Sequence, residues 1–300
     1  MFHCLRERAA QDNIPVHSIQ HHEAHFGAVL AENNLLQSNE PVLGVIWDGT
    51  GYGSDEQIWG GEFFIFEDHE MHRVAHLDYF SQLLADKMSK EPRLSALSLL
   101  KNFRKKQEVI RKYFSEKEWE FYQKQIQQPG QLLTSSVGRW LDGLAAILGV
   151  CDLNSYEGEA AMTLEALASR HRNDSIEYYP IQLSNNRLRH DVMLPYLFED
   201  LEAKEDVSFV AWKIFCSLAK AVEHVSNYYN ISNIAFSGGV FQNELLTGLV
   251  NQLMSESKEL FFHKQLSPND ECIGFGQVAC YELLKAKQST YNQLSTSYVS

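Results

Sequence analysis

Residues 42–64 read VLGVIWDGTGYGSDEQIWGGEFF, an apolar run that passes into a glycine-rich stretch and then resumes. The run up to Trp47 is rich in β-branched residues, which predicts a buried strand. Glycines at alternate positions in residues 48–53 predict a turn whose backbone N–H groups can closely approach an anion. IWGGEFFIFE and HRVAHLDYF predict two further strands, so residues 41–80 are expected to form a three-stranded meander.

The rest of the chain predicts alternating helices and strands. Residues 91–128 have a helical, heavily charged pattern, and residues 207–229 predict a long amphipathic helix. The strand ISNIAFSGG, the helix FQNELLTGLVNQLM, the strand ELFFHK and a last helix near 274–287 follow in order. This succession indicates a mixed α/β domain, whereas residues 286–300 show no periodicity and are expected to form a disordered tail.

Composition narrows the class of protein. The chain has 300 residues with 44% hydrophobic content and a net charge of −13, which argues against an extended grip on nucleic acid. No apolar run approaches the roughly 18 residues of a membrane span, and the N-terminus lacks a signal-peptide core, so we expect a cytoplasmic protein. Five scattered cysteines without a Cys-x-x-Cys pair predict free thiols rather than disulfides.

The stretch HHEAH at residues 21–25 places three histidines at the start of a predicted helix. His21 and His25 are spaced i, i+4, so their rings project from one face and can share a metal ion. His22 points elsewhere, and Glu23 does not match the base of a zinc protease. A further ligand is needed, and Asp270 in SPNDECIGFGQ is the candidate.

Other turns between strands and helices also contain residues that can bind a metal, a hydroxyl group or a phosphate. An aspartate at a strand end, such as Asp48, can hold a metal or a hydroxyl group. SGGVFQN, with Gly238 and Gly239, is a strand leading through a double glycine into a helix whose N-terminus can receive phosphate or a purine ribose. SSVGRWLD and SYEGEAAM add Asp142 and Gly158 near helix starts.

Six segments in colinear order carry a resemblance to a known family, from about His17 to Leu284. They are HHEAH, residues 42–64, SSVGRWLDGLAAILG, SYEGEAAMTLEALA, FSGGVFQN and PNDECIGFGQ. The set resembles the C-terminal, TsaD-like carbamoyltransferase half of the hydrogenase maturation factor HypF. That half is similar to the actin-like, sugar-kinase and Hsp70 ATPase superfamily, which implies an α/β, ribonuclease H-like lobe that binds a nucleotide beside a metal.

The resemblance also implies a reaction. In the family an upstream domain makes carbamoyl-adenylate from carbamoyl phosphate and ATP. The transferase domain then moves the carbamoyl group to the C-terminal cysteine of HypE during nickel–iron hydrogenase maturation. The implied cofactors are ATP or carbamoyl-adenylate, with AMP as product, and a divalent metal (zinc, iron or manganese). The implied partners are a HypE-like acceptor and an adenylate-forming domain in cis or in trans, with no direct nucleic-acid or membrane partner.

The resemblance implies which residues of this sequence match the family's site residues. Those that match metal ligands are His21, His25 and Asp270. Those that match the phosphate and acyl loop are Trp47, Asp48, Gly49, Thr50 and Gly51. Those expected to hold ribose, adenine or phosphate are Asp142, Gly158, Gly238, Gly239 and Asn243. Asp48, Lys87 and Arg93 are the candidate catalytic residues, the last two facing carbamoyl-adenylate.

Several features depart from the family. The first lobe is expected to be truncated, with residues 1–40 its remnant carrying the histidine helix. Residues 41–285 then form the second lobe, with a helical insert near 90–130 and a nucleotide-binding core. Glu271 and Cys272 stand where the family has two glycines, and Leu84 and Ala85 replace two more. Any positive φ at these positions would strain the backbone.

Two other functions remain open. A related carbamoyltransferase acting on a tRNA adenosine or a small hydroxylated metabolite is the first, although the acidity of the chain weighs against tRNA. The second is a truncated domain that binds nucleotide or a partner without turnover. An apolar surface exposed where the absent lobe would pack is a further expectation.

Overall fold

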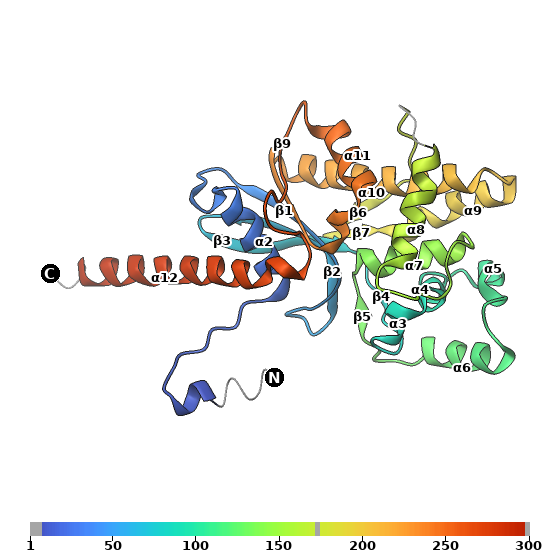
Figure 1. The fold of residues 1–300 in the computed structure, drawn as a ribbon, viewed down its shortest axis with the longest axis horizontal. Coiled ribbons are helices and arrows are strands. Elements are labelled where there is room, and N and C mark those ends of the chain that lie inside the picture. Colours follow the sequence, from blue (N-terminus) through green and yellow to red (C-terminus); the bar gives the residue numbers. More distant parts are fainter. Residues whose placement is uncertain (1–7, 172–174, 298–300) are drawn as a thin grey trace.

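The computed structural model describes residues 8–171 and 175–297, and a single sheet runs through its centre (Figure 1). Strands β1 (Val42–Tyr52), β2 (Ile58–Glu67) and β3 (Glu70–Leu77) form an antiparallel meander. Strands β8 (Asn233–Ser237) and β9 (Glu259–Phe261) continue the sheet beyond β1, parallel to it. The resulting order β3-β2-β1-β8-β9 is the ribonuclease H-like arrangement. The expected fold class is confirmed.

Short strands complete the sheet. They are β4 (Phe80–Ser81), β5 (Leu133–Thr134), β6 (Gln182–Ser184) and β7 (Arg187–Arg189). β7 and β6 extend the sheet beyond β3, while β5 pairs with both β2 and β4.

β1 is buried on both faces, which explains its nearly continuous apolar run. Leu43 and Val45 join the larger core, and Val42 and Ile46 join a smaller core with Phe26. Because successive side chains of a strand point to opposite faces, this split places one core on each side of the sheet.

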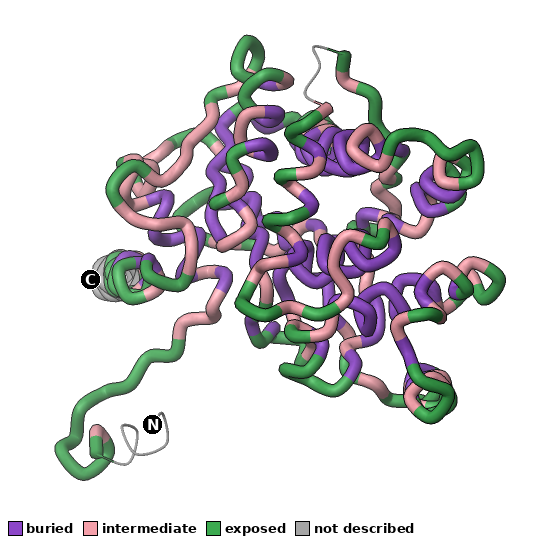
Figure 2. Tube along the Cα trace, turned by 45° about the vertical axis from the view of Figure 1, so that its right-hand side comes forward, coloured by how far each residue is buried: buried purple, intermediate pink, exposed green. Residues whose placement is uncertain are grey.

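Helices cover both faces of the sheet. α2 (His21–Glu32) packs on β1 and β8 and is crossed by α12 (Ile273–Ser297). α7 (Val137–Ile147), α10 (Val207–Tyr229) and α11 (Glu244–Met254) contribute to the larger core. Burial is concentrated in these layers, whereas residues 10–18 are exposed and extend away from the body (Figure 2).

The remaining helices lie at the side of the sheet away from α12 (Figure 1). They are α3 (Lys87–Lys90), α4 (Pro92–Leu99), α5 (Glu108–Arg111), α6 (Glu116–Ile126), α8 (Glu159–Ala168) and α9 (Leu194–Ala203). The charged helical region predicted over 91–128 is thus three helices joined by a 3₁₀ turn, Arg104–Gln107. A capping box between Ser115 and Glu118 forms the N-terminus of α6, so α6 is a separate helix.

The C-terminal part of the chain differs from its prediction. α12 is helical through residues 286–297, where the sequence predicts no regular structure, and residues 298–300 lie outside the described residues. Of the helices in the described ranges, none has the length and apolarity that crossing a membrane requires. The four described cysteines are free, and Cys4 lies outside the described residues.

Candidate metal centre and its glycine-rich surroundings

The start of α2 presents two histidines toward the ends of the central strands. The side chain of Gln20 caps the helix by accepting the backbone N–H groups of His22 and Glu23, so the helix begins at His21. The rings of His21 and His25 then lie one turn apart, with centroids separated by 4.9 Å. His22 is fully buried and meets Gln20 and Trp59 instead, as the helical spacing predicts.

Two aspartates complete a four-residue cluster with these histidines, defined here as the metal cluster: His21, His25, Asp48 and Asp270. Asp48 Oδ2 lies 3.1 Å from His21 Nε2 and 3.4 Å from His25 Nε2. Asp270 Oδ1 lies 3.4 Å from each of the same two nitrogens. One ligand atom from each residue falls within 4.8 Å of all the others.

The sheet explains why such distant residues meet. Asp48 follows the part of β1 that pairs in parallel with β8, with Ile46 opposite Ser237. The carboxyl ends of parallel strands share one edge, so Asp48 and the glycines after Ser237 lie together there. Asp270 begins the short 3₁₀ turn Asp270–Cys272 that leads into α12, and it closes the cluster from the other side.

The charges of the cluster are strongly coupled. Burial lowers the pKa of His21 and of His25, but hydrogen bonds to Asp270 and Asp48 outweigh it and raise the pKa values to about 9 and about 11. Burial raises the pKa of Asp48, yet the two histidines hold it well below its usual range. Hydrogen bonds from His21 and His25 likewise lower the pKa of Asp270. Without a cation, protonated imidazoles thus balance the two carboxylates.

The donor set fits a divalent cation. His25 Nε2 is buried and, within the described structure, makes no hydrogen bond of good geometry, although both carboxylates lie near it. An atom in that state is unusual in a folded protein, and a cation between the four groups would satisfy it. Two imidazole nitrogens with two carboxylates suit zinc, iron or manganese.

The glycine-rich stretch is a bulged strand and not the predicted turn. β1 continues to Tyr52, and between the pairs Trp47–Gly61 and Gly51–Trp59 three residues of β1 face only Gly60 of β2. Bulges of this kind re-aim side chains at functional edges. Here the bulge turns Asp48 toward α2.

Hydrogen bonds from two neighbouring elements fix the bulge. Ser136, which caps α7, donates its hydroxyl to the carbonyl oxygens of Asp48 at 2.9 Å and Gly49 at 2.7 Å. Asp48 Oδ1 accepts the backbone N–H of Gly239 at 3.2 Å. The bulge is therefore held from α7 on one side and from the end of β8 on the other.

Members of the predicted phosphate and acyl loop have different surroundings. A Cβ placed on Gly49 would meet only Arg139 Nη2, at 3.8 Å, so this glycine leaves room for a ligand. A Cβ on Gly51 would collide with the rings of His21 and His22, which gives this glycine a packing role. Thr50 is exposed, whereas Trp47 is 1% exposed and stacks on Phe241. The structure thus places Trp47 in the core and not in a loop.

The residues predicted to hold nucleotide come from three places in the fold: the turn after β8, the start of α8 and the start of α11. Gly238 has φ of 99°, and a Cβ there would approach the carbonyl oxygen of Trp47 to 2.1 Å. Gly158 has φ of 79° at the start of α8 and faces open space. Asn243 caps α11 by accepting the N–H of Leu246 at 2.7 Å. Gly239 is engaged by Asp48, as described above.

Asp142 has a different environment from the open one that the prediction implies. Its side chain is fully buried in α7, and its carboxylate pairs with Arg139 Nη2 at 3.1 Å. Burial raises the pKa of Asp142 to about 6 despite the attraction of Arg139. Arg139 lies near Gly49 and pairs with Asp142, so the side chain of Arg139 separates Asp142 from the glycine-rich stretch.

Lys87 and Arg93 are engaged by the helical insert. Lys87 Nζ donates to the hydroxyl of Tyr122 at 2.7 Å and pairs with Glu91 at 3.3 Å. Arg93 is buried, and its guanidinium donates to Glu91, to Glu118 and to a backbone carbonyl. Local acceptors therefore already engage the guanidinium of Arg93. A catalytic role for Lys87 and Arg93 stays a prediction.

The four family glycines that this chain replaces fall into two groups. Leu84 and Ala85 adopt φ of 55° and 48°, so the backbone keeps the left-handed conformation without glycine. Glu271 and Cys272 do not have positive φ, and no strain arises there. Glu271 is exposed, and Cys272 is buried behind His25, with Sγ 3.3 Å from Nδ1 of that histidine.

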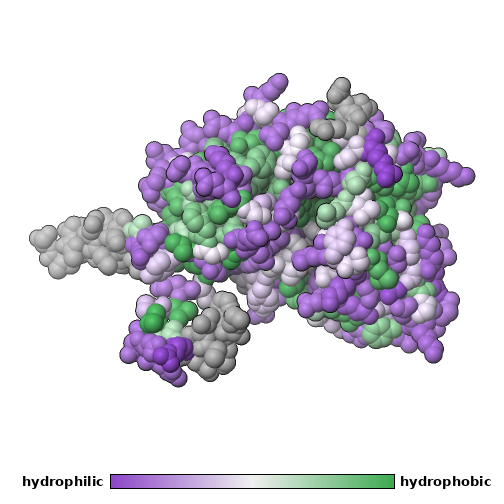
Figure 3. All heavy atoms as spheres, in the orientation of Figure 1, coloured by the Kyte–Doolittle hydropathy of each residue, from purple (hydrophilic) through white to green (hydrophobic). Residues whose placement is uncertain are grey.

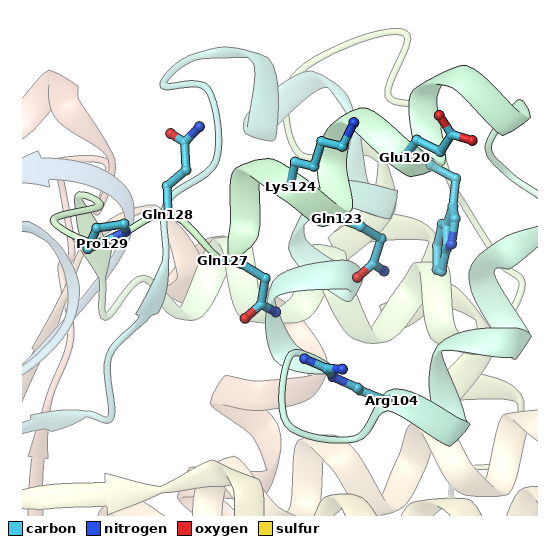
Figure 4. Close-up of a pocket in the computed structure, with 8 residues that line it drawn as sticks. Arg104, Glu120, Gln123, Lys124, Gln127, Gln128 and Pro129 are labelled. Carbon is cyan, nitrogen blue, oxygen red and sulfur yellow. The ribbon is translucent and has the colours of Figure 1, made fainter.

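A surface groove occurs elsewhere, between α6 and the 3₁₀ turn before α5. Arg104, Gln123, Lys124 and Gln127 are among the residues that line it, and Gln123 in α6 and Gln127 just after it point toward Arg104 (Figure 4). None of the lining residues belongs to the metal cluster. The chemistry of the predicted site therefore does not involve this groove.

Sequence reasoning missed the residues that support the cluster. Ser136 could have been noticed as a helix cap in SSVGRWLD, but its bond to the bulge depends on the tertiary fold. The far nitrogen of His25 contacts Ser237, which is followed in turn by His263 and Glu32, and only the structure reveals this series of contacts.

The fold and the cluster define a class, that of α/β domains with a ribonuclease H-like sheet and a candidate divalent-metal site at the strand ends. Residues 44–277 match the family described as carbamoyltransferase, Kae1-like domain, second subdomain. The chain belongs to this family.

Relatives from several sources support the assignment. Carbamoyltransferase HypF of Synechocystis is 33% identical over 90% of this chain and 37% of its own length. The probable carbamoyltransferase HypF of Methanocaldococcus jannaschii is 34% identical over 88% of this chain and 35% of its own length. The chain thus spans little more than a third of these curated relatives.

Two solved structures show the same fold. HypF from T. kodakarensis superposes with a TM-score of 0.83 at 27% identity, over 94% of this chain and 38% of its own. Full-length HypF in its phosphate- and nucleotide-bound form gives a TM-score of 0.80 at 28% identity, over 89% of this chain and 36% of its own. The resemblance stated from sequence is confirmed.

Proposed function

We propose that this chain moves a carbamoyl group from carbamoyl-adenylate to the C-terminal cysteine thiol of a HypE-like protein. The observation that carries the proposal is the metal cluster, which lies beside an open glycine on a sheet of the carbamoyltransferase family. A related HypF was solved with nucleotide and phosphate, which supports an adenylate as the ligand here.

His21, His25, Asp48 and Asp270 would hold the cation. A divalent cation supplies neutralisation of phosphate charge, which makes AMP a better leaving group. The open side of Gly49 would accept the phosphate, while the bond from Gly239 to Asp48 keeps that carboxylate aimed at the histidines. Gly158 and Asn243 are the proposed neighbours of the ribose and adenine.

The transfer needs no nucleophile from this chain. The acceptor thiol first loses its proton to solvent, which a pKa near 8.5 permits at neutral pH. The thiolate sulfur attacks the carbamoyl carbon, and a C–S bond forms. The bond between that carbon and the phosphate oxygen breaks, and AMP departs with the electron pair. The chain contributes by holding both partners in reacting geometry.

Carbamoyl-adenylate would come from an adenylate-forming domain, in cis or in trans. The acidity of the chain disfavours a tRNA adenosine as the acceptor.

Metal content and calorimetric binding of ADP by the purified chain test the site. We expect one divalent cation per chain and loss of that cation in His21→Ala, with the fold retained by circular dichroism. A chain that binds neither cation nor nucleotide would contradict the proposal.

A second experiment tests the transfer. The chain is mixed with an adenylate-forming domain, ATP, carbamoyl phosphate and a HypE-like acceptor, and the acceptor is weighed by mass spectrometry. We expect the mass of one carbamoyl group on the acceptor and none on a control acceptor that lacks its C-terminal cysteine. Transfer to adenosine in place of the thiol would identify the alternative acceptor.

A further inference from the structure

A chain of hydrogen bonds lies behind His25, on the side away from the metal cluster. His25 Nδ1 lies 3.3 Å from the hydroxyl of Ser237, and that hydroxyl lies 2.8 Å from His263 Nε2. His263 Nδ1 lies 2.7 Å from Glu32 Oε2. The side chains of His263 and Glu32 are 2% and 9% exposed, so water does not substitute freely for these contacts.

The polarity of the chain follows from the available protons. A carboxylate only accepts hydrogen bonds, so Glu32 takes the proton-bearing Nδ1 of His263. In the neutral ring, His263 Nε2 then carries no proton, so it accepts the hydrogen bond donated by the hydroxyl of Ser237. The oxygen of Ser237 in turn accepts the N–H of His25 Nδ1. Every donor has one acceptor, and the nitrogen of His25 left for a cation is Nε2, which faces Asp48 and Asp270.

Glu32 also connects the two segments that carry the ligands. It is the last residue of α2, the helix that supplies both histidines. Its other oxygen, Oε1, accepts the backbone N–H groups of Lys264, Gln265 and Leu266 at 3.0, 2.5 and 3.2 Å. These residues begin the segment that reaches Asp270, so one carboxylate holds that segment against the histidine helix.

We infer that Ser237, His263 and Glu32 are positioning residues of the metal centre, which fix His25 in the tautomer that leaves Nε2 free for the cation. The inference rests on the metal site of the proposed function. Partners behind a metal-binding histidine generally orient the ring and raise its affinity for the metal. Here the chain of contacts also joins the ring to the segment that carries Asp270.

Cys272 is the competing partner of the same nitrogen. Its Sγ lies 3.3 Å from His25 Nδ1 and 3.9 Å from the hydroxyl of Ser237. Cys272 also contacts Ser237 and His263, but among the described contacts only His263 joins this group directly to Glu32. We therefore assign the orienting role to Ser237 and His263, and Cys272→Ala serves as the comparison.

The test measures affinity for Co²⁺ and Zn²⁺ by competition with a chromophoric chelator. His263→Asn keeps a donor for Glu32 but removes the acceptor for Ser237, and we expect affinity to fall about 10- to 100-fold. His263→Gln places an amide oxygen near the lost Nε2, and we expect it to recover part of that loss. His190, buried against Phe80 in another part of the sheet, provides the control His190→Asn, which should bind as wild type.

A spectroscopic measurement makes the test independent of activity. In the zinc-loaded wild type, ¹⁵N shifts of His25 should report a protonated Nδ1 and a metal-bound Nε2. If His263→Asn fails to fold, Ser237→Ala removes only one hydroxyl and tests the same contact.

The outcomes separate the two proposals. Wild-type affinity in folded His263→Asn and Ser237→Ala, or a larger loss in Cys272→Ala than in either, overturns the inference while the metal site stands. A wild-type chain that binds neither cation overturns the metal site and the inference together.

Discussion

The imidazoles of His21 and His25 carry protons that a cation must displace. Hydrogen bonds to Asp270 and Asp48 outweigh burial and raise the pKa values of both rings to about 9 and about 11. Only the neutral imidazole binds a metal, so metal uptake and proton release are linked.

We therefore expect metal affinity to rise with pH from about 6 to about 9, with protons released into the buffer. Calorimetry in buffers of different ionisation enthalpy measures the protons released. Asp270→Asn removes the strongest of the interactions that raise these two pKa values, so the variant should release fewer protons when it binds a metal. An affinity independent of pH would contradict this coupling.

The metal-free protein should show the matching dependence of stability. Groups whose folded pKa lies above the unfolded value of about 6.5 stabilise the folded state fully below that pH. Their contribution is lost as pH rises through the folded pKa values of His21 and His25. Urea unfolding of chelator-treated protein should accordingly give a free energy of unfolding that falls from about pH 6.5 to about pH 11. Zinc should abolish that fall.

Ala85 lies in a left-handed conformation with φ of 48°, next to Leu84 at 55°, and both side chains are exposed. That conformation costs a residue with a Cβ roughly 1–2 kcal/mol. Ala85→Gly should raise the free energy of unfolding by about 1 kcal/mol, since little packing is lost. The same change in exposed helix, Ala166→Gly in α8, should lower it by about 1 kcal/mol. If both variants lose a similar amount of free energy of unfolding in urea, the backbone at Ala85 is not strained.

Sequence predicts the metal centre well where spacing within one helix determines it. The i, i+4 pair His21 and His25 is such a case. Asp48 was predicted as a catalytic and loop residue that can hold a metal. Its place beside His21 and His25 depends on a bulge in β1, and the alternating glycines predicted a turn there instead. The contacts of Arg93 could not be foreseen, because its acceptors Glu91 and Glu118 come together only when the insert folds, and its catalytic role stays a prediction.

At the scale of elements, α2 and α12 approach each other unusually closely. A Cβ on Gly276 would lie 1.8 Å from the carbonyl oxygen of Ala24, and one on Gly27 would lie 2.5 Å from Cys280 Sγ. The contact is therefore backbone against backbone, and it places the start of α12 beside the histidines.

Gly276→Ala should push α12 away from α2, with a loss of about 1–3 kcal/mol in the free energy of unfolding. Because the turn carrying Asp270 leads into α12, metal affinity should fall as well. Urea unfolding and chelator competition measure the two effects.

Gly274 provides the matched control on the same helix. A Cβ there meets nothing within 4 Å, and alanine favours a helix by up to about 1 kcal/mol over glycine. Gly274→Ala should leave stability unchanged or improve it. A Gly276→Ala variant that behaves like Gly274→Ala would contradict the close packing of the two helices.

The elements of the sheet follow from the sequence because β1 is apolar on both faces and the meander alternates. The break of residues 91–128 into three helices does not follow from periodicity. It depends on caps such as Ser115 with Glu118. The extent of α12 beyond residue 286 was also missed, because that segment lacks an apolar face and the prediction relied on one.

At the scale of the molecule, α12 projects from the body (Figure 1). Near its start Phe275 is 47% exposed and Val278 is 62% exposed, and Ile14 and Val16 in the N-terminal segment are also exposed. On the body of the molecule, hydrophobic residues appear among hydrophilic ones (Figure 3). Exposed apolar side chains of this kind favour association with other apolar surfaces.

We expect the isolated chain to bind a fluorescent apolar dye and to self-associate at high concentration. Replacing Phe275 and Val278 together by serine should reduce dye fluorescence and association in light scattering, without lowering metal affinity. A control change of Tyr196 and Tyr228, which are exposed elsewhere, should leave both signals as in the wild type. If both pairs of variants give equal signals, dye binding and self-association do not depend on α12.

The donors of the metal cluster lie far apart in the sequence, with His21 at the start of α2 and Asp270 just before α12. During synthesis, a nascent chain that ends at α11 has both histidines and Asp48 but lacks Asp270. The four-donor site would thus be complete only after residue 270 has left the ribosome.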